Sequence, residues 1–154
     1  MNKNKIEHIW TVLCSSSTTD QETNNISLIN ALEELRVASD AFAKESDIAE
    51  KGLVVPIAFE LITLWKRTEE GREDISIDAE LEITDPNNKS VGKYLFPIKI
   101  KTGTERSRVR LRFPNMKVTM PGEYLFTIKL KDGKGSFHKA TQTYLQIKFA
   151  LVKK

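Results

Sequence analysis

Residues 74–84 read DISIDAELEIT, and this stretch decides the fold. Every second position from Ile75 to Ile83 is apolar, and the positions between them are polar or acidic. A period of two places the apolar side chains on one face of an extended strand and the polar ones on the other. This is the pattern of an antiparallel strand that covers a core on one side and faces water on the other.

The same alternation continues to the C-terminus. It recurs in residues 94–101, 108–113, 123–131 and 141–152. Short segments of turn-forming residues separate these runs: Asp85-Pro86-Asn87-Asn88, Thr102-Gly103-Thr104, Pro121-Gly122 and Asp132-Gly133-Lys134-Gly135. Strands at even spacing with turn signals between them indicate a sandwich of antiparallel sheets rather than βαβ units. Pro97, inside one run, favours an edge strand or a bulge because proline cannot donate to the ladder.

The N-terminal half is less regular. Residues 8–16 are rich in β-branched and aromatic side chains and predict a first strand. Residues 26–37 fit two patterns: Leu28, Leu32, Leu35 and Phe42 share a helical face, whereas a strand would be interrupted by Glu33. We prefer the strand, because neighbouring strands on each side make an antiparallel return natural. Residues 38–52 suit a short helix or an exposed loop.

Residues 54–67 predict a strand with apolar side chains on both faces. Such a strand is covered on both sides, either by its own chain or at an oligomer contact. The fold that we predict is therefore all-β: one antiparallel, immunoglobulin-like β-sandwich domain over residues 1–154. It has seven or eight strands, with at most one short helix near residues 38–52.

Composition and cysteine usage favour an ordinary cytoplasmic protein. Apolar residues make up 40% of the 154-residue chain, and the single cysteine, Cys14, cannot form an internal disulfide. The apolar run at residues 9–13 is short for a signal peptide and follows Glu7 and His8. No run approaches the roughly 18 apolar residues of a membrane span. We expect a cytoplasmic location and no membrane association.

Most catalytic and metal-binding chemistries find no support in this sequence. The chain has two histidines, His8 and His138, and one cysteine, with no zinc-ligand spacing and no glycine-rich phosphate loop. Acidic and amide residues near Asp85 and Asp132 are better explained as turns than as calcium ligands. Glu80 and Glu82 are better explained as a solvated strand face than as a catalytic pair. We predict no enzyme activity, no cofactor and no metal.

Charge is unevenly distributed. Residues 1–90 carry 9 Lys+Arg against 18 Asp+Glu, and residues 91–154 carry 15 against 3, with a net charge of +3. The basic half contains a possible anion- or partner-binding surface, in which the arginines share one strand face. If the preceding strand returns as a hairpin, two lysines lie beside them. The six residues are Lys99, Lys101, Arg106, Arg108, Arg110 and Arg112.

Two explanations of this basic surface stay open. Like charges on one strand face repel each other, so a counter-charge is expected. Asp78, Glu80 and Glu82 would supply it if their strand were adjacent, and we favour this structural explanation. The alternative is an acidic ligand, either nucleic acid or an acidic protein surface. No aromatic side chain alternates with these arginines, which argues against stacking of single-stranded bases.

Four stretches resemble a family of uncharacterised bacterial proteins: residues 7–14 (EHIWTVLC), 20–30 (DQETNNISLIN), 55–57 (VPI) and 121–124 (PGEY). The resemblance implies a small bacterial β-sandwich and a strand rather than a helix over residues 26–35. It carries over no catalytic residue. Our leading hypothesis is a non-catalytic bacterial module that acts through protein–protein contacts, with a protein partner or a second copy. The alternative is anion or nucleic-acid binding through the face of Arg108, Arg110 and Arg112.

Overall fold

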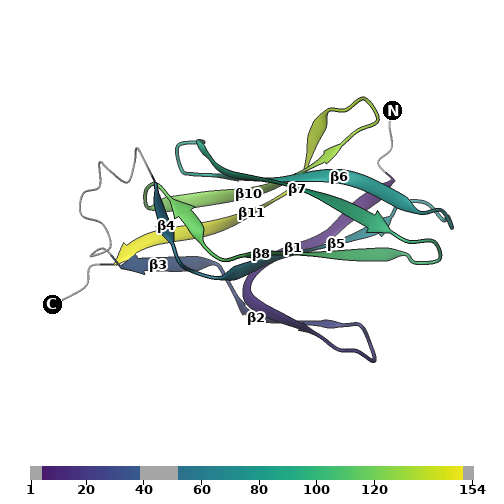
Figure 1. Ribbon diagram of the computed structural model, residues 1–154, viewed down its shortest axis with the longest axis horizontal. Coiled ribbons are helices and arrows are strands. Elements are labelled where there is room, and N and C mark those ends of the chain that lie inside the picture. The colour runs from purple at the N-terminus through teal and green to yellow at the C-terminus, as the bar shows by residue number, and fades with distance from the viewer. Residues whose placement is uncertain (1–4, 39–51, 151–154) are drawn as a thin grey trace.

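The computed structural model describes residues 5–38 and 52–150, and all the regular structure in these ranges is β-strand (Figure 1). The strands are β1 (Ile6–Thr19), β2 (Ile26–Ala31), β3 (Glu34–Ala38), β4 (Leu53–Val55), β5 (Phe59–Arg67), β6 (Ile75–Thr84), β7 (Ser90–Ile100), β8 (Arg106–Phe113), β9 (Met116–Val118), β10 (Gly122–Lys131) and β11 (Phe137–Ala150).

Two sheets face each other. The four-stranded sheet has the order β2-β1-β5-β8, and the five-stranded sheet has the order β3-β11-β10-β6-β7. Their paired neighbours are antiparallel except β3 and β11, which are parallel, and β4 pairs with β9 in a small third sheet. The predicted β-sandwich is confirmed. Strand β7 lies at the edge of its sheet, as Pro97 indicates.

The core lies between the two sheets and is built from the predicted apolar faces. In residues 74–84, the alternation buries Ala79, Leu81 and Ile83, and it exposes Ser76 and Asp78. The largest fully buried side chains are Trp65, Tyr124, Phe59 and Phe126. The single hydrophobic cluster draws on both sheets, which is why the period-two pattern predicts the fold so well.

Tyr124 fixes the connection that enters β10. Its hydroxyl donates to the Met120 carbonyl at 2.7 Å and accepts from the Thr119 and Met120 amides at 3.0 and 3.2 Å. This is the tyrosine corner of immunoglobulin-like sandwiches, in which a buried hydroxyl satisfies backbone groups at a corner between sheets. The Thr119 hydroxyl also donates to Asp85 at 2.7 Å, which ties this corner to the β6–β7 turn.

The ambiguous N-terminal segments resolve into strands. Residues 26–37 form β2 and most of β3, separated at Leu32 and Glu33. Residues 54–67 belong to β4 and β5, which are separated by an irregular segment that begins at Pro56. The short helix expected near residues 38–52 falls on residues 39–51, outside the described ranges.

The β7–β8 hairpin that would place Lys99 and Lys101 beside the arginines does not form. Strand β7 pairs with β6 in the five-stranded sheet, whereas β8 pairs with β5 in the four-stranded sheet. The connection crosses between the sheets, and Arg67 of β5 holds it by donating to the carbonyls of Thr104 and Lys101 at 2.6 and 2.8 Å. Gly103 supplies the positive φ of 80° that this turn requires.

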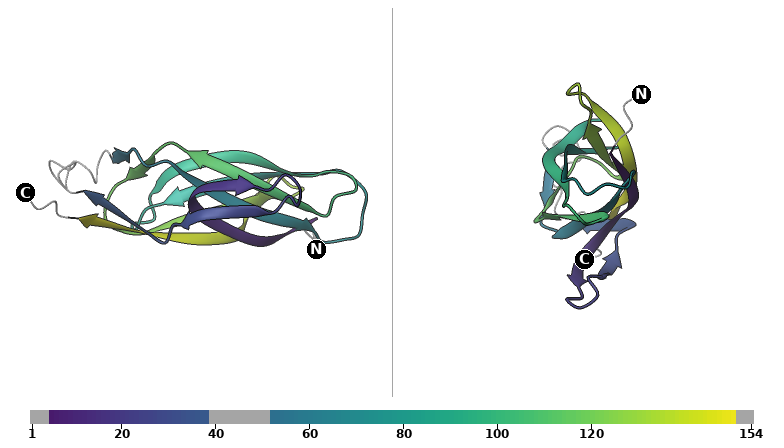
Figure 2. Two further views of the ribbon diagram at one scale, coloured as in Figure 1. Left: turned by 90° about the horizontal axis from the view of Figure 1, so that it is seen from below. Right: turned by 90° about the vertical axis from the view of Figure 1, so that its right-hand side faces the viewer.

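The β1–β2 hairpin forms a partial third layer. The N-terminal part of β1, up to Cys14, pairs with β5, and the part from Cys14 onward pairs with β2. By its pairing the hairpin belongs to the four-stranded sheet, but it projects from the body of the sandwich, as Figure 1 and the right-hand view of Figure 2 show. Its tip is a tight turn in which Asp20 accepts hydrogen bonds from the amides of Glu22 and Thr23.

Candidate anion-binding site

Part of the outer face of the four-stranded sheet is apolar and covered. Ile62 and Cys14 are fully buried, although neither belongs to the core cluster between the sheets. The β1–β2 hairpin lies over this face, and its Ser17 donates to Glu60 of β5 at 2.5 Å. The chain therefore covers both faces of β5 itself, and the oligomer contact suggested by its two apolar faces is not needed to explain them.

Two of the predicted arginines neutralise a buried carboxylate. Glu60 is 7% exposed, and its Oε1 lies 3.3 Å from Nε of Arg112. The other oxygen, Oε2, lies 3.9 Å from Nε of Arg110 and also accepts the Ser17 hydrogen bond. Glu60 is the register partner of Arg112, and Ile62 is that of Arg110. These contacts make Arg110 and Arg112 part of the structure that holds the hairpin.

The counter-charge expected from Asp78, Glu80 and Glu82 does not reach the arginines. Those acidic residues lie on β6, which belongs to the five-stranded sheet, where Glu82 pairs with Lys93 and Lys129 at 3.2 and 3.3 Å. The prediction that the acidic strand is adjacent to the basic one is wrong, because β8 pairs with β5 instead of β7. Glu60 supplies the counter-charge instead, and it pairs with Arg112 and Arg110 but not with Arg108.

Arg108 extends the arginine row to the tip of the hairpin. Its two terminal nitrogens donate to the Asn24 carbonyl, each at 3.2 Å, and Arg110 donates to the Thr19 hydroxyl at 3.3 Å. Carbonyl and hydroxyl oxygens orient a guanidinium without cancelling its charge. Arg108 is thus fixed in place while it keeps its full positive charge.

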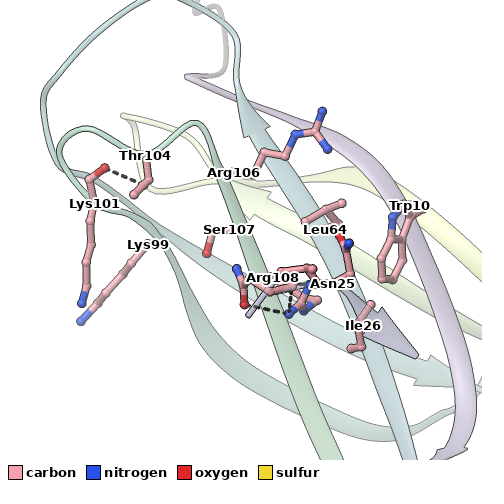
Figure 3. A pocket seen from close by; sticks show the side chains of 12 residues that line it. Trp10, Asn25, Ile26, Leu64, Lys99, Lys101, Thr104, Arg106, Ser107 and Arg108 are labelled. Atoms are coloured by element: carbon pink, nitrogen blue, oxygen red, sulfur yellow. Dashed lines mark hydrogen bonds between the residues drawn. The ribbon is translucent and has the colours of Figure 1, made fainter. Parts of the chain in front are cut away.

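An open pocket of about 780 Å³ lies between the hairpin tip and the β7–β8 connection (Figure 3). We call it the cationic pocket. Its lining residues are Trp10, Thr23, Asn24, Asn25, Ile26, Leu64, Lys99, Lys101, Thr104, Arg106, Ser107 and Arg108. Figure 3 shows Lys99 and Lys101 on one side, Trp10 on the other, and Arg108 with Asn25 between them.

The charged residues that line the cationic pocket are all basic. Its lining includes four cationic side chains and no acidic one. Among residues 5–38 and 52–150, no ion pair involves Lys99, Lys101, Arg106 or Arg108. The nearby carboxylate of Asp74 accepts from the hydroxyl and amide of Thr102, both at 2.6 Å, and these hydrogen bonds lower the pKa of Asp74. An ionised Asp74 therefore holds the turn that carries Lys101.

The structure thus brings together four of the six basic residues that the sequence singles out, and assigns the remaining two, Arg110 and Arg112, to Glu60. Sequence reasoning missed Trp10, Leu64 and the hairpin tip as part of the same site. Trp10 and Leu64 are register partners on β1 and β5. The residue pattern along each strand shows that Trp10 and Leu64 lie on a strand face. It does not show that this face lies beside residues 99–108.

Other candidate sites are accounted for structurally. Asp85 is buried, and its carboxylate accepts from the amides of Asn87 and Lys89, both at 2.9 Å, and from the Thr119 hydroxyl. Within the described ranges, no three His, Cys, Asp or Glu side chains are grouped to hold a metal ion. Those ranges also contain no helix that is long and apolar enough to span a membrane.

Comparison of the sequence with protein-family models and with curated proteins yields no match. Among solved structures, the alkylpurine DNA glycosylase AlkC of Pseudomonas fluorescens, bound to DNA with an abasic site analog, matches 94% of this chain at 6% identity and a TM-score of 0.50. A glycosyl hydrolase family 2 member from Bacteroides cellulosilyticus matches 62% at 14% identity and a TM-score of 0.45. A β-glucosidase from Listeria innocua in complex with glucose matches 93% at 11% identity and a TM-score of 0.44.

This chain spans 30%, 13% and 16% of those three proteins, respectively. A likeness at such low identity concerns the fold alone.

Proposed function

We propose that this protein is a non-catalytic binding module that takes an anionic ligand in the cationic pocket. One observation carries the proposal: Lys99, Lys101, Arg106 and Arg108 line one open pocket that has no acidic lining residue. Concentrated positive charge attracts an anion and accelerates its association. A cytoplasmic location belongs to the same proposal and rests on the single, unpaired cysteine of the chain.

The positions of the four cations support a ligand that carries several charges. Arg106 and Arg108 are two residues apart on β8, and Lys99 of β7 is two residues from Lys101, which directly follows that strand. Side chains at such positions share a strand face and recur about every 7 Å. A polymer with evenly repeated negative charges meets more of them at once than a single small anion does.

Inorganic polyphosphate tests this proposal. We expect it to bind the protein, and we expect Lys99→Ser/Lys101→Ser to weaken binding roughly tenfold, since each exposed ion pair contributes up to about 1 kcal/mol. Lys131→Ser/Lys134→Ser, at the end of β10 and in the turn that follows it, is the matched control, because it removes the same charge outside the pocket. Titration calorimetry that finds no binding, or equal losses in both variants, would overturn the proposal.

A second candidate function is self-association through β7, which is the last strand of its sheet in the described part of the chain. Leu95 is 74% exposed on this edge strand, and an uncovered strand edge is a template for pairing with another chain. This candidate keeps the hypothesis of a module that acts through protein–protein contacts, but it places the contact on β7 instead of β5. Light scattering of the wild type and of Leu95→Lys tests it: a concentration-dependent dimer that the substitution abolishes supports it, and a wild-type monomer at all concentrations contradicts it.

A further inference from the structure

The wall of the cationic pocket opposite the lysines is apolar. Trp10, Leu64 and Ile26 come from β1, β5 and β2, and all three are only partly buried. The Trp10 side chain stands beside Leu64 and Ile26 in Figure 3. A partly exposed indole beside aliphatic side chains offers a surface on which a planar group can stack.

Neutral polar groups lie between the two walls. Thr23, Asn24 and Asn25 of the hairpin tip and Ser107 of β8 line this part of the pocket. The amide side chain of asparagine offers both donors and an acceptor, and hydroxyls do the same. Arg108 fixes the tip by bonding to the Asn24 carbonyl, so these groups are held between the aromatic wall and the cationic one.

We infer that the anionic ligand is single-stranded nucleic acid, with a base stacked on Trp10 and the phosphates on the lysine and arginine side chains. This inference rests on the proposed function and names the class of ligand. Single-strand binding combines a basic groove along the backbone with aromatic platforms for the bases. An acidic peptide would satisfy the cations, but it carries no planar group on each unit for the indole.

The geometry also disfavours a duplex as the ligand. Trp10 is reached from inside a pocket whose sides are the hairpin tip and the β7–β8 connection, so a base must leave its stack to touch the ring. Unpaired bases are already free to do so.

Tryptophan fluorescence gives a direct readout, because Trp65 is fully buried in the core and Trp10 is partly exposed. We expect a short oligothymidylate to bind and to quench the emission. The logarithm of its affinity should fall with the logarithm of salt concentration, and Lys99→Ser/Lys101→Ser should reduce that slope by about 1 to 1.5. Trp10→Leu should weaken oligothymidylate binding on the order of tenfold, whereas Trp10→Phe, which keeps an aromatic ring, should lose less.

Two polyanions that carry no nucleobases, inorganic polyphosphate and oligoglutamate, distinguish the nucleic-acid inference from the proposed function. Inorganic polyphosphate should bind Trp10→Leu as it binds the wild type, which also shows that the pocket of this variant is intact. If polyphosphate or oligoglutamate binds as tightly as oligothymidylate at equal charge, and Trp10→Leu leaves oligothymidylate binding unchanged, the nucleic-acid inference is wrong and anion binding stands. If none of the three probes binds, both proposals are wrong.

Discussion

The guanidinium Nε of Arg112 lies 3.3 Å from the carboxylate of Glu60, a residue 52 positions earlier on the neighbouring strand. Glu60 is buried, but 70% of the Arg112 side chain is exposed. The buried carboxylate therefore needs hydrogen bonds from its protein partners, whereas water can solvate the exposed guanidinium. Together with Ser17 and Arg110, this pair fastens the hairpin to the sheet and leaves the charge of Arg108 available at the pocket.

This asymmetry predicts unequal costs of substitution. Glu60→Ala should lower the free energy of unfolding by about 1–3 kcal/mol, because hydrogen bonds to a charged group are lost at a buried position. Arg112→Ala should cost less than about 1 kcal/mol, as exposed ion pairs contribute little. Urea unfolding of both variants measures the difference, and an Arg112→Ala variant less stable than Glu60→Ala would contradict it.

The tyrosine corner predicts a large effect of removing a single oxygen atom. Tyr124→Phe leaves the Thr119 and Met120 backbone groups without their partner, and we expect a loss of about 1–3 kcal/mol in unfolding free energy. Tyr144→Phe is the matched control, since Tyr144 is 53% exposed and its hydroxyl makes one long bond of 3.4 Å to Gln142. Equal stability of the two variants in thermal denaturation would count against this account of the corner.

His8 predicts a loss of stability in mild acid. Burial lowers the pKa of His8 below its ordinary value of 6.5, against a smaller raising effect of a backbone hydrogen bond at Trp10. The unfolded chain therefore takes up this proton first, and stability falls as the pH decreases from about 6.5. His8→Gln should flatten the unfolding free energy between about pH 7 and pH 5.

Protonation of carboxylates does not explain a change in unfolding free energy between about pH 7 and pH 5. Hydrogen bonds from Thr102 lower the pKa of Asp74 below its ordinary 3.8, so its contribution is present above that pH and is lost only in stronger acid. A wild-type profile that is already flat from pH 7 to pH 5 would contradict the assignment to His8.

The reactivity of the Cys14 thiol measures how stably the β1–β2 hairpin covers it. Its side chain is fully buried, and burial, followed by the nearby Glu60 charge, raises the pKa of its thiol, so the folded protein should react slowly with a thiol reagent. Arg110→Ala removes contacts to Glu60 and Thr19 and should speed the reaction about fivefold for each kcal/mol of lost hairpin stability.

Arg106→Ala is the control for this experiment, because Arg106 lines the pocket but makes no ion pair with the hairpin in the described part of the chain. Its labelling rate should match that of the wild type. Fast labelling of the wild type itself would mean that the hairpin does not cover Cys14.

The sequence predicts the fold well where one core sets the pattern. The alternation in residues 74–84 is confirmed, because a period of two places every second side chain between the two sheets. It fails at the β7–β8 connection for a physical reason. A turn such as Thr102-Gly103 reverses the chain equally well within one sheet or from one sheet to the other, and only pairing with β5 decides between them.

The candidate site is predicted in part. Periodicity places the arginines on one strand face, and their charge density points to an anion. Their neutralising partner and the aromatic wall lie far away in the sequence, on Glu60 and Trp10. Both join the arginines through the strand order β1-β5-β8, which no local pattern encodes.

The most direct test of the central claim is the location of the bound anion. In a titration of the isotopically labelled protein with inorganic polyphosphate, followed by amide chemical shifts, we expect the largest shifts at residues 23–26 and 99–108, which contribute most of the cationic pocket. The amide shifts of Lys93 and Lys129, which pair with Glu82 and do not line the pocket, should not change. Shifts that centre on those lysines, or no shifts at all, would contradict the account.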